Sequence, residues 1–383
     1  MIIPRFLIVP DSFKNCLTAQ QAGTAIQQGI LKVFPDTVVS VIPMADGGEG
    51  TVETILSVHG GEKVTVEVVD SFLRPHKAFL GILPNKKTAI IEMAAANGLE
   101  LHKPKELNPW IASTYGTGLL IKKALDLGCN ELIIGIGGSA TNDGGVGMAK
   151  ALGVKFLDKQ GKDIGDGPGV FNKLYRIDTL NLDKRIATVR ITVASDVTNT
   201  LIGPQGASFV YAHQKGADQG LVEKLDKHLG ILSKQIKKDL NLDAAKIVGG
   251  GAAGGLGAGL VCFLGASIKS GFEVISEWVD LEQQIIKHDI VITAEGTFDY
   301  QSAYGKTPVG VATLARKNEK PVFLMAGNFS DEIPENLSKL FTALIPISKR
   351  PVNITEALLK ASIWLEDAAQ MLAKIIQGSL VVL

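Results

Sequence analysis

The feature that most constrains this chain is a strand–helix alternation that appears at both ends and is interrupted between them. Residues 5–9 form a short apolar run, residues 18–33 carry apolar side chains at helical spacing, and residues 38–43 return to a strand pattern. The alternation resumes at residues 289–296 and continues to the end of the chain. Alternating strands and helices of this kind predict a parallel sheet covered by helices.

The interruption predicts a second domain. Residues 63–94 hold three strand-like runs with turns between them and no helical pattern, which indicates an antiparallel meander. We therefore predict an α/β protein with two α/β domains. A doubly wound (Rossmann- or flavodoxin-like) parallel-sheet domain, residues 1–62 with 286–383, is interrupted by a larger inserted mixed α/β domain, residues 63–285. Thr18 is expected to cap the first helix and Gly378 to end the last one.

Composition excludes several classes of protein. The 39 basic residues equal the 39 acidic ones, so the chain lacks the basic excess of a nucleic-acid binder. The three cysteines have no metal or redox spacing, and the apolar N-terminus lacks the pattern of a signal peptide. The uncharged stretch 247–268 is rich in glycine and is interpreted as a buried turn and helix rather than a membrane span. We expect a cytoplasmic protein that binds neither nucleic acid nor membrane, and homo-oligomerisation stays open.

The 42 glycines cluster in polar loops that follow strand-like runs. Such loops bring backbone N–H groups close to phosphates and leave room for carboxylates to bind a cation. The acidic residues expected to serve Mg²⁺ are Asp46, Glu49 and Asp143. The residues expected to bind phosphate groups or the rest of a phosphate-bearing ligand are Gly137, Gly138, Ser139, Thr141, Asn142, Gly254, Gly255, Glu295, Asp299 and Lys306.

Other candidates lie at predicted strand ends or in polar turns. Asp196 follows the strand-like run RITVA and is the hypothesised general base, and Lys14 is the second catalytic candidate. The residues expected to bind the substrate are Asp11, Ser12, Lys14, Arg74 and Lys215. For each of these, capping of a turn or plain exposure to solvent is the open alternative. The six histidines are scattered without a zinc or triad signature and are interpreted as surface or satisfied polar residues.

Two matches to a dinucleotide-binding fingerprint leave another enzyme class open. The spacing G-x-G-x-x-A begins at Gly135, and G-x-G-x-x-G begins at Gly249. An alternative function is therefore a nicotinamide-dependent oxidoreductase acting on a small hydroxy acid. A lone fingerprint is weak, and this motif usually opens a cofactor domain rather than lying within an insert.

Several longer motifs, in their order along the chain, resemble the type I glycerate kinase family. They are PDSFK, PMADGGEG, IEMAAANGL, STYGTG, GIGGSATNDGG, SDVTN, QKGA and GAAGGLGAG. The resemblance implies a kinase that transfers the γ-phosphoryl group of ATP, with Mg²⁺, directly to a hydroxyl of D-glycerate, giving 2-phosphoglycerate. Because motif loops come from both predicted domains, we expect the active site in the cleft between them. Thr297 stands where the family often has arginine, so a sugar-acid-binding regulator without turnover also stays open.

Overall fold

The computed structural model describes residues 3–13, 16–44, 48, 50–299, 307–330 and 333–381. Contacts divide the chain into a terminal unit, Met1–Ala45 with Ile275–Leu383, and a central unit, Asp46–Val274. The sequence predicted domain boundaries at residues 62 and 285. Helix α2 (Thr51–His59) accounts for much of the difference at the first boundary, because it packs on strands β4 and β5 of the central unit.

The terminal unit is the doubly wound domain. Its five strands run parallel in the order β13-β12-β11-β1-β2, the flavodoxin-like arrangement. The strands are β1 (Phe6–Pro10), β2 (Val39–Val41), β11 (Ile290–Phe298), β12 (Val322–Phe329) and β13 (Ala343–Pro346). The helices are α1 (Ala19–Leu31), α10 (Leu281–Lys287), α11 (Thr307–Lys317), α12 (Glu335–Ser338) and α13 (Ile354–Val381), and α9 (Gly271–Trp278) spans the boundary between the units.

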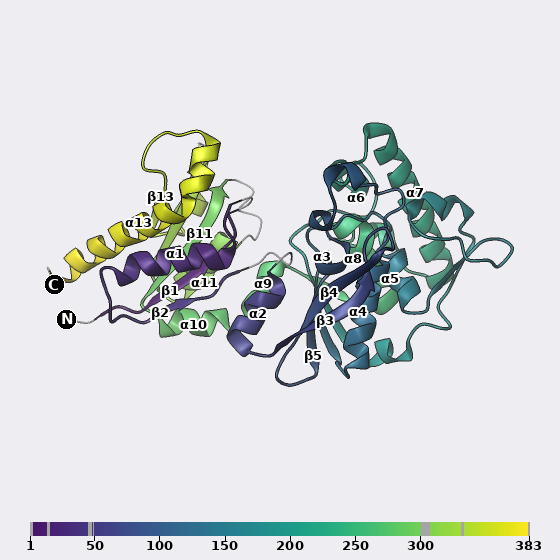
Figure 1. The fold of residues 1–383 in the computed structure, drawn as a ribbon, viewed down its shortest axis with the longest axis horizontal. Coiled ribbons are helices and arrows are strands. Elements are labelled where there is room, and N and C mark those ends of the chain that lie inside the picture. The colour runs from purple at the N-terminus through teal and green to yellow at the C-terminus, as the bar shows by residue number, and fades with distance from the viewer. Residues whose placement is uncertain are drawn as a thin grey trace. The chain divides into compact units, whose positions relative to one another are not determined.

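Local signals explain why this unit folds as it does. All five residues of β1 are buried, as expected for an interior strand of a parallel sheet. Thr18 caps α1 as predicted, and Gln21 completes a capping box. Helices α1 and α13 pack against each other (Figure 1). The prediction that Gly378 ends the last helix was wrong, because α13 continues through it to Val381.

The central unit is built on a mixed six-stranded sheet in the order β10-β9-β6-β5-β4-β3, with a separate β7–β8 pair. Its strands are β3 (Glu62–Val69), β4 (Pro75–Ile82), β5 (Thr88–Glu92), β6 (Glu131–Gly135), β7 (Lys155–Leu157), β8 (Arg176–Asp178), β9 (Arg190–Ala194) and β10 (Ser267–Lys269). Its other helices are α3 (Ala94–Asn97), α4 (Tyr115–Asp126), α5 (Val146–Ala151), α6 (Ala207–Tyr211), α7 (Gln219–Leu240) and α8 (Leu256–Leu264). The predicted antiparallel meander is confirmed in β3–β4–β5, and β5, β6, β9 and β10 then run parallel.

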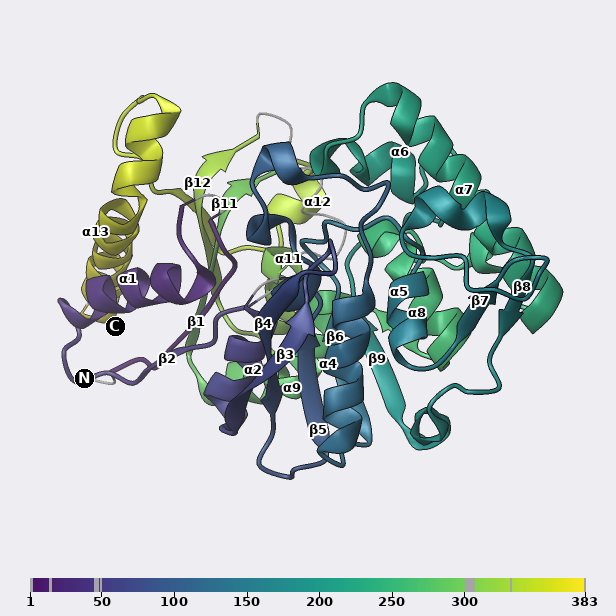
Figure 2. The ribbon, with the colours of Figure 1, turned by 45° about the vertical axis from the view of Figure 1, so that its right-hand side comes forward.

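Helices cover both faces of this sheet. Side chains alternate along β4, so Leu80 joins the core that contains Leu120 and Ile121 of α4. Gly81 points the other way, and a Cβ placed there would lie 3.0 Å from Val52 of α2. Figure 2 shows α4 lying along β3 and β4. This layered core fixes the strand ends that carry the polar loops.

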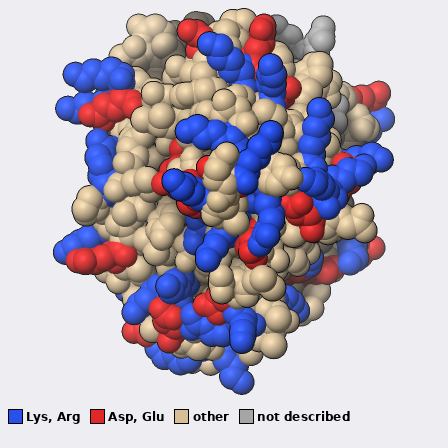
Figure 3. Space-filling model, turned by 90° about the vertical axis from the view of Figure 1, so that its right-hand side faces the viewer, with Lys and Arg blue, Asp and Glu red and all other residues tan. Residues whose placement is uncertain are grey.

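The distribution of charged side chains and the character of the helices bear on whether the protein has a nucleic-acid or membrane surface. On the face drawn in Figure 3, basic and acidic side chains are interspersed. Within the described ranges, no helix has the length and apolar character needed to cross a bilayer.

Candidate active site

The parallel strands of the central unit end together. Glu92 of β5 pairs with Gly135 of β6, Gly135 with Ala194 of β9, and Ala194 with Lys269 of β10. The segments that follow these residues therefore leave the sheet along one carboxyl edge. Ligands of open α/β sheets bind beyond this edge, so the polar loops after β5, β6, β9 and β10 define the candidate site.

The glycine-rich loop after β6 is exposed only at its beginning. Gly138 is exposed and takes a positive φ of 72°, which glycine adopts at little cost. In the part of the chain that the structure describes, the backbone N–H groups of Gly137, Gly138 and Ser139 have no hydrogen-bond acceptor. Consecutive N–H groups at an exposed turn can bind an anion.

The rest of this loop turns inward and is held by the segment after β5. The Leu99 N–H donates to the Gly138 carbonyl at 2.8 Å, and the Ala140 N–H donates to the Asn97 carbonyl at 2.9 Å. Residues 139–146 are buried. The predicted phosphate ligands Thr141 and Asn142 thus lie beneath the exposed turn, and the Ser139 side chain is buried under it.

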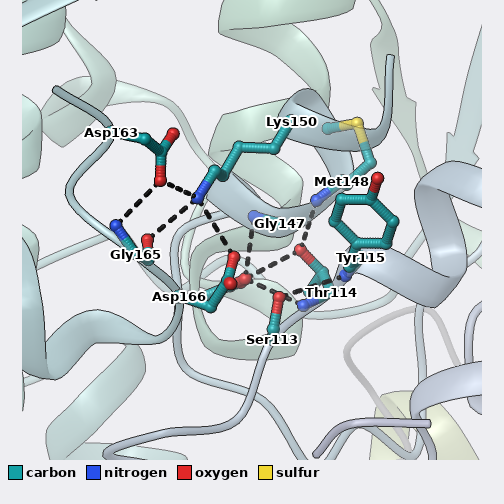
Figure 4. Close-up of polar contacts among 10 residues, drawn as sticks. Ser113, Thr114, Tyr115, Gly147, Met148, Lys150, Asp163, Gly165 and Asp166 are labelled. Atoms are coloured by element: carbon teal, nitrogen blue, oxygen red, sulfur yellow. Dashed lines mark hydrogen bonds and ion pairs between the residues drawn. The ribbon is translucent and has the colours of Figure 1, made fainter. Parts of the chain in front are cut away.

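Asp143 is fully buried and joins two helix starts. Its carboxylate accepts four hydrogen bonds: from the Thr114 N–H (2.8 Å), the Thr114 hydroxyl (2.9 Å), the Gly145 N–H (3.1 Å) and the Gly147 N–H (3.0 Å). Thr114 Oγ1 also accepts from the Met148 N–H at 2.9 Å (Figure 4). Burial raises the pKa of Asp143, although these hydrogen bonds oppose the rise. A metal bound directly to Asp143 would have to compete with these donors.

Lys215 reaches the same loop from the turn after α6. Its side chain is 1% exposed, and its ammonium donates to Ser139 Oγ at 2.7 Å and to the Thr141 carbonyl at 2.6 Å. Burial lowers the pKa of Lys215 to about 7, and the charge of Asp143 only partly offsets this. Thr141 Oγ1 and Asn142 Oδ1 are buried without a hydrogen-bond partner among the described residues.

Asp196 lies at the end of β9, as predicted, and is partly buried. Its Oδ1 accepts from the Ser270 hydroxyl at 2.8 Å and from the Gly271 N–H at 2.7 Å. These bonds hold the start of α9 against the carboxyl edge. Asp196 therefore anchors the loop after β10. If Asp196 is the general base, it must accept the proton of the substrate while it keeps these two hydrogen bonds.

The turn containing Gly254 and Gly255 packs against the glycine-rich loop. Both residues have positive φ angles, 66° and 92°. A Cβ at Gly254 would lie 2.1 Å from the Thr141 carbonyl oxygen, and the Gly144 N–H donates to the Gly254 carbonyl at 3.0 Å. Close packing between backbones explains why these two positions are glycine.

The terminal unit presents its own polar residues at the β1/β11 switch point. Pro10 of β1 pairs with Ala294 of β11, so Asp11 and Glu295 follow adjacent positions. Asp11 Oδ1 accepts from the Ser12 N–H at 2.6 Å. Glu295 is buried within β11, and Asp299 follows that strand.

Some predicted site residues lie outside the described residues, and some buried polar residues near the site were not predicted. Those outside are Lys14, Asp46, Glu49 and Lys306. No three His, Cys, Asp or Glu side chains within the described ranges are placed to hold a metal ion. Sequence reasoning missed the buried residues Glu92, Asn97 and His102; only the polar character of Glu92 and Asn97 inside the apolar motif IEMAAANGL could have drawn attention to them.

Comparison with known proteins decides the family. The profile of the glycerate kinase family matches residues 6–377. The chain belongs to the glycerate kinase family. It is 42% identical to a glycerate kinase of Halalkalibacterium halodurans over 96% of this chain and 97% of that protein. It is 45% identical to the glycerate 2-kinase of Escherichia coli K12 over 86% of each chain.

A solved structure supports the same assignment. The crystal structure of a glycerate kinase 2 from Salmonella typhimurium LT2 matches with a TM-score of 0.85 and 40% identity, and covers 99% of both chains. The chain is thus a kinase with glycerate kinase function, and the α/β fold class predicted from the sequence is confirmed.

Proposed function

We propose that this glycerate kinase transfers the γ-phosphoryl group of ATP directly to the C2 hydroxyl of D-glycerate, giving 2-phosphoglycerate and ADP. The hydroxyl oxygen bonds to the γ-phosphorus while the bond to the β–γ bridging oxygen breaks, and the hydroxyl proton passes to a carboxylate. The Escherichia coli relative is a glycerate 2-kinase, which supports the choice of hydroxyl. Phosphoryl transfer depends mainly on positioning and on neutralising charge, so few protein groups need to react.

The observation that carries the proposal is the exposed turn after β6. Its three N–H groups, from Gly137 to Ser139, can bind phosphate oxygens at the carboxyl edge of a parallel sheet. Thr141, Asn142 and Asp143 then support this turn from beneath rather than contact the phosphates. Lys215 supplies a positive charge behind the turn through Ser139.

The remaining groups are assigned as proposals. Asp196 accepts the proton of the attacking hydroxyl, and Arg74 binds the acid substrate. Asp11, Ser12 and Lys14 serve glycerate from the terminal unit, and Glu295, Asp299 and Lys306 serve ATP. That residues of the two units act on one substrate, as expected of a cleft site, stays a prediction.

Magnesium fits the reaction, because a cation neutralises the phosphate charge. The described residues do not by themselves form a metal site. We propose Asp46 and Glu49, the acidic residues of the motif PMADGGEG, as the groups that serve Mg²⁺. Replacing Asp46 by asparagine is expected to raise the Mg²⁺ concentration required for half-maximal turnover. An unchanged Mg²⁺ titration and unchanged turnover would remove Asp46 from this role.

The overall proposal is tested by the product. Purified enzyme is incubated with D-glycerate, ATP and Mg²⁺, and the product is examined by proton-coupled phosphorus NMR. A phosphate on C2 couples to one proton and gives a doublet, whereas a phosphate on C3 couples to two and gives a triplet. A triplet would move the reaction to the C3 hydroxyl. Tight glycerate binding without ADP formation would favour a regulator, the alternative that Thr297 left open.

A further inference from the structure

A buried carboxylate at the end of β5 has no part in the reaction proposed above. Within the described ranges, the central unit buries three carboxylate side chains, those of Asp70, Glu92 and Asp143. Asp70 Oδ2 accepts from Arg74 Nε at 2.6 Å inside the β3–β4 turn, and Asp143 joins the starts of α4 and α5. Glu92 is 2% exposed and is the last residue of β5. Burying an acidic side chain is costly unless hydrogen bonds compensate for it, so a buried carboxylate indicates a specific partner.

Glu92 faces helix α2. Side chains alternate along a strand, so Glu92 points to the same face of the sheet as Ile90. Ile90 pairs with Gly81 of β4, and Gly81 faces Val52 of α2. On this face, Glu92 Oε1 accepts a hydrogen bond from the Val52 N–H at 2.7 Å. The carboxylate at the end of a strand thus binds the first turn of a helix.

This bond supplies a cap that α2 cannot supply itself. The residue before the helix is Gly50, which has a φ of 90° and no side chain to accept from the first N–H groups. An acceptor at this place satisfies a backbone donor, and a carboxylate also interacts favourably with the positive end of the helix dipole. Thr51 Oγ1 donates to the Gly48 carbonyl at 2.9 Å and ties the same turn to the preceding loop. Glu92 and Thr51 therefore connect the end of the motif PMADGGEG to the sheet.

The strand end that carries Glu92 also lies next to the exposed turn after β6, Gly137–Ser139. Glu92 pairs with Gly135 of β6 in the parallel ladder. Beyond the strands the two segments stay close, because a Cβ at Gly138 would lie 3.5 Å from the Cβ of Ala94. One side chain thus links the motif PMADGGEG to the edge of the sheet at which the exposed turn begins.

We propose that Glu92 is a positioning residue for phosphoryl transfer, which holds the motif PMADGGEG, through the first turn of α2, at a fixed separation from the exposed turn after β6. A metal ion that serves phosphates has to be held where the phosphates bind, so this separation matters to the reaction. Glu92 acts through Val52 and contacts neither substrate nor metal. The service of the motif to Mg²⁺ rests on the proposed function, whereas the attachment of α2 to the strand end rests on the contacts alone.

The test uses the full-length enzyme and two substitutions at one position. Glu92→Leu removes the acceptor, and Glu92→Gln keeps Oε1 as an acceptor for the Val52 N–H but removes the charge. Ile55→Val is the matched control, because Ile55 is fully buried on α2 beyond its first turn, so the substitution weakens the packing of the helix without touching its start. Thr51→Val removes the bond to Gly48 and tests the link from its other end, including the case in which Glu92→Leu does not fold.

We expect Glu92→Leu to raise the Mg²⁺ concentration for half-maximal turnover roughly 5- to 10-fold, the factor that corresponds to losing a helix cap. Thr51→Val should raise it in the same direction, whereas Glu92→Gln and Ile55→Val should stay near wild type. The KM for D-glycerate should stay constant in all four variants. Binding of Mn²⁺ in the presence of ADP, followed by electron paramagnetic resonance, should weaken in Glu92→Leu and Thr51→Val, which would show that the metal site and not only turnover has changed.

Several results would overturn this role. An unchanged Mg²⁺ requirement and unchanged Mn²⁺ binding in Glu92→Leu and Thr51→Val, with both altered in Asp46→Asn, would leave Glu92 as a purely structural residue. Equal losses in Glu92→Leu and Glu92→Gln would show that the charge itself is needed at the site. Equal losses in Glu92→Leu and Ile55→Val would show that only the stability of α2 matters.

Failure of the proposed function would look different. Wild-type enzyme that forms no ADP with D-glycerate would exclude phosphoryl transfer to this acid, and Mn²⁺ binding in the presence of ADP would still compare Glu92→Leu with wild type. An Mg²⁺ titration that is unchanged in Asp46→Asn, Glu92→Leu and Thr51→Val alike would remove the metal from the motif and, with it, the role of Glu92.

Discussion

At the scale of the residue, Lys215 stands out in the central unit because it is a lysine with an almost fully buried side chain. Its ammonium is buried against a hydroxyl and a carbonyl, and no carboxylate accepts a hydrogen bond from it within the described residues. A lysine so placed loses hydration without a direct ion pair, which explains why its pKa falls to about 7.

The first prediction follows from this pKa. Between pH 7 and the ordinary lysine value of 10.5, the unfolded chain binds more protons at Lys215 than the folded chain. Stability therefore rises with pH across this window, by up to about 1.4 kcal/mol per pH unit. Lys215→Met removes the effect, so its free energy of unfolding, relative to wild type, should fall steadily from pH 7 to pH 9 in urea titrations.

Lys150 provides the control for this prediction. Its ammonium lies 2.7 Å from Asp163 Oδ1 and 3.1 Å from Asp166 Oδ1 (Figure 4). Because its charge is paired directly, Lys150→Met should change the free energy of unfolding by a similar amount at pH 7 and pH 9. A pH-independent difference between wild type and Lys215→Met would show that Lys215 titrates normally in the folded protein.

Asp196 gives the second prediction at this scale. An asparagine keeps the shape of the side chain but cannot accept the hydroxyl proton, so turnover should fall roughly 10²- to 10⁴-fold with little change in the KM for glycerate. Ser270→Ala removes one hydrogen bond to Oδ1 and leaves the carboxylate charge in place. Steady-state kinetics in which Ser270→Ala loses as much turnover as Asp196→Asn would indicate that Asp196 only fastens α9.

At the scale of the element, Asp143 connects the starts of α4 and α5. Thr114 precedes α4 and Gly145 precedes α5, and the carboxylate bonds both. Asp143→Asn replaces one acceptor oxygen by a donor that faces N–H groups, so we expect a loss of about 3 kcal/mol in the free energy of unfolding. Asp126→Asn, at the half-exposed end of α4, should stay within about 0.5 kcal/mol. Urea unfolding at pH 7 measures both, and equal losses would contradict the role given to Asp143.

A comparison of the predicted and observed helices and strands shows which structural features the sequence pattern could predict. The apolar runs at 5–9 and 289–296 predicted β1 and β11, and the helix-free stretch 63–94 predicted the meander, because periodicity reports which faces are buried. Gly378 failed as a stop signal because a single glycine within a helix costs only about 1 kcal/mol, which does not by itself end a helix as long as α13 (Ile354–Val381).

The candidate site was harder to predict than the strands. A sequence such as Gly-Gly-Ser-Ala-Thr-Asn-Asp reads as an exposed polar loop, yet most of it is buried by Asn97, Lys215 and Ser208, which are distant in sequence. Position at a strand end was predictable. Which side chains then turn inward depends on these long-range contacts.

At the scale of the whole molecule, the two units are built differently. The core of the central unit draws its residues from Val66 to Ala266, in one continuous stretch of chain. The core of the terminal unit combines Phe6–Phe34 with residues from Ile290 onward. Within its sheet, β1 lies between β2 and β11, so the N-terminal segment supplies an interior strand as well as the edge strand β2.

The last prediction follows from this difference. Residues 46–274 expressed alone should unfold cooperatively in urea, because the fragment retains every strand of its six-stranded sheet and the whole of its core. Residues 275–383 alone should not, because without β1 the strand β11 has an unpaired edge and α13 loses its packing against α1. Far-UV circular dichroism during urea titration measures both fragments. A non-cooperative transition in the first fragment would show that the contacts of the central unit do not suffice for its folding, and a cooperative one in the second would show that the terminal unit does not depend on β1 and α1.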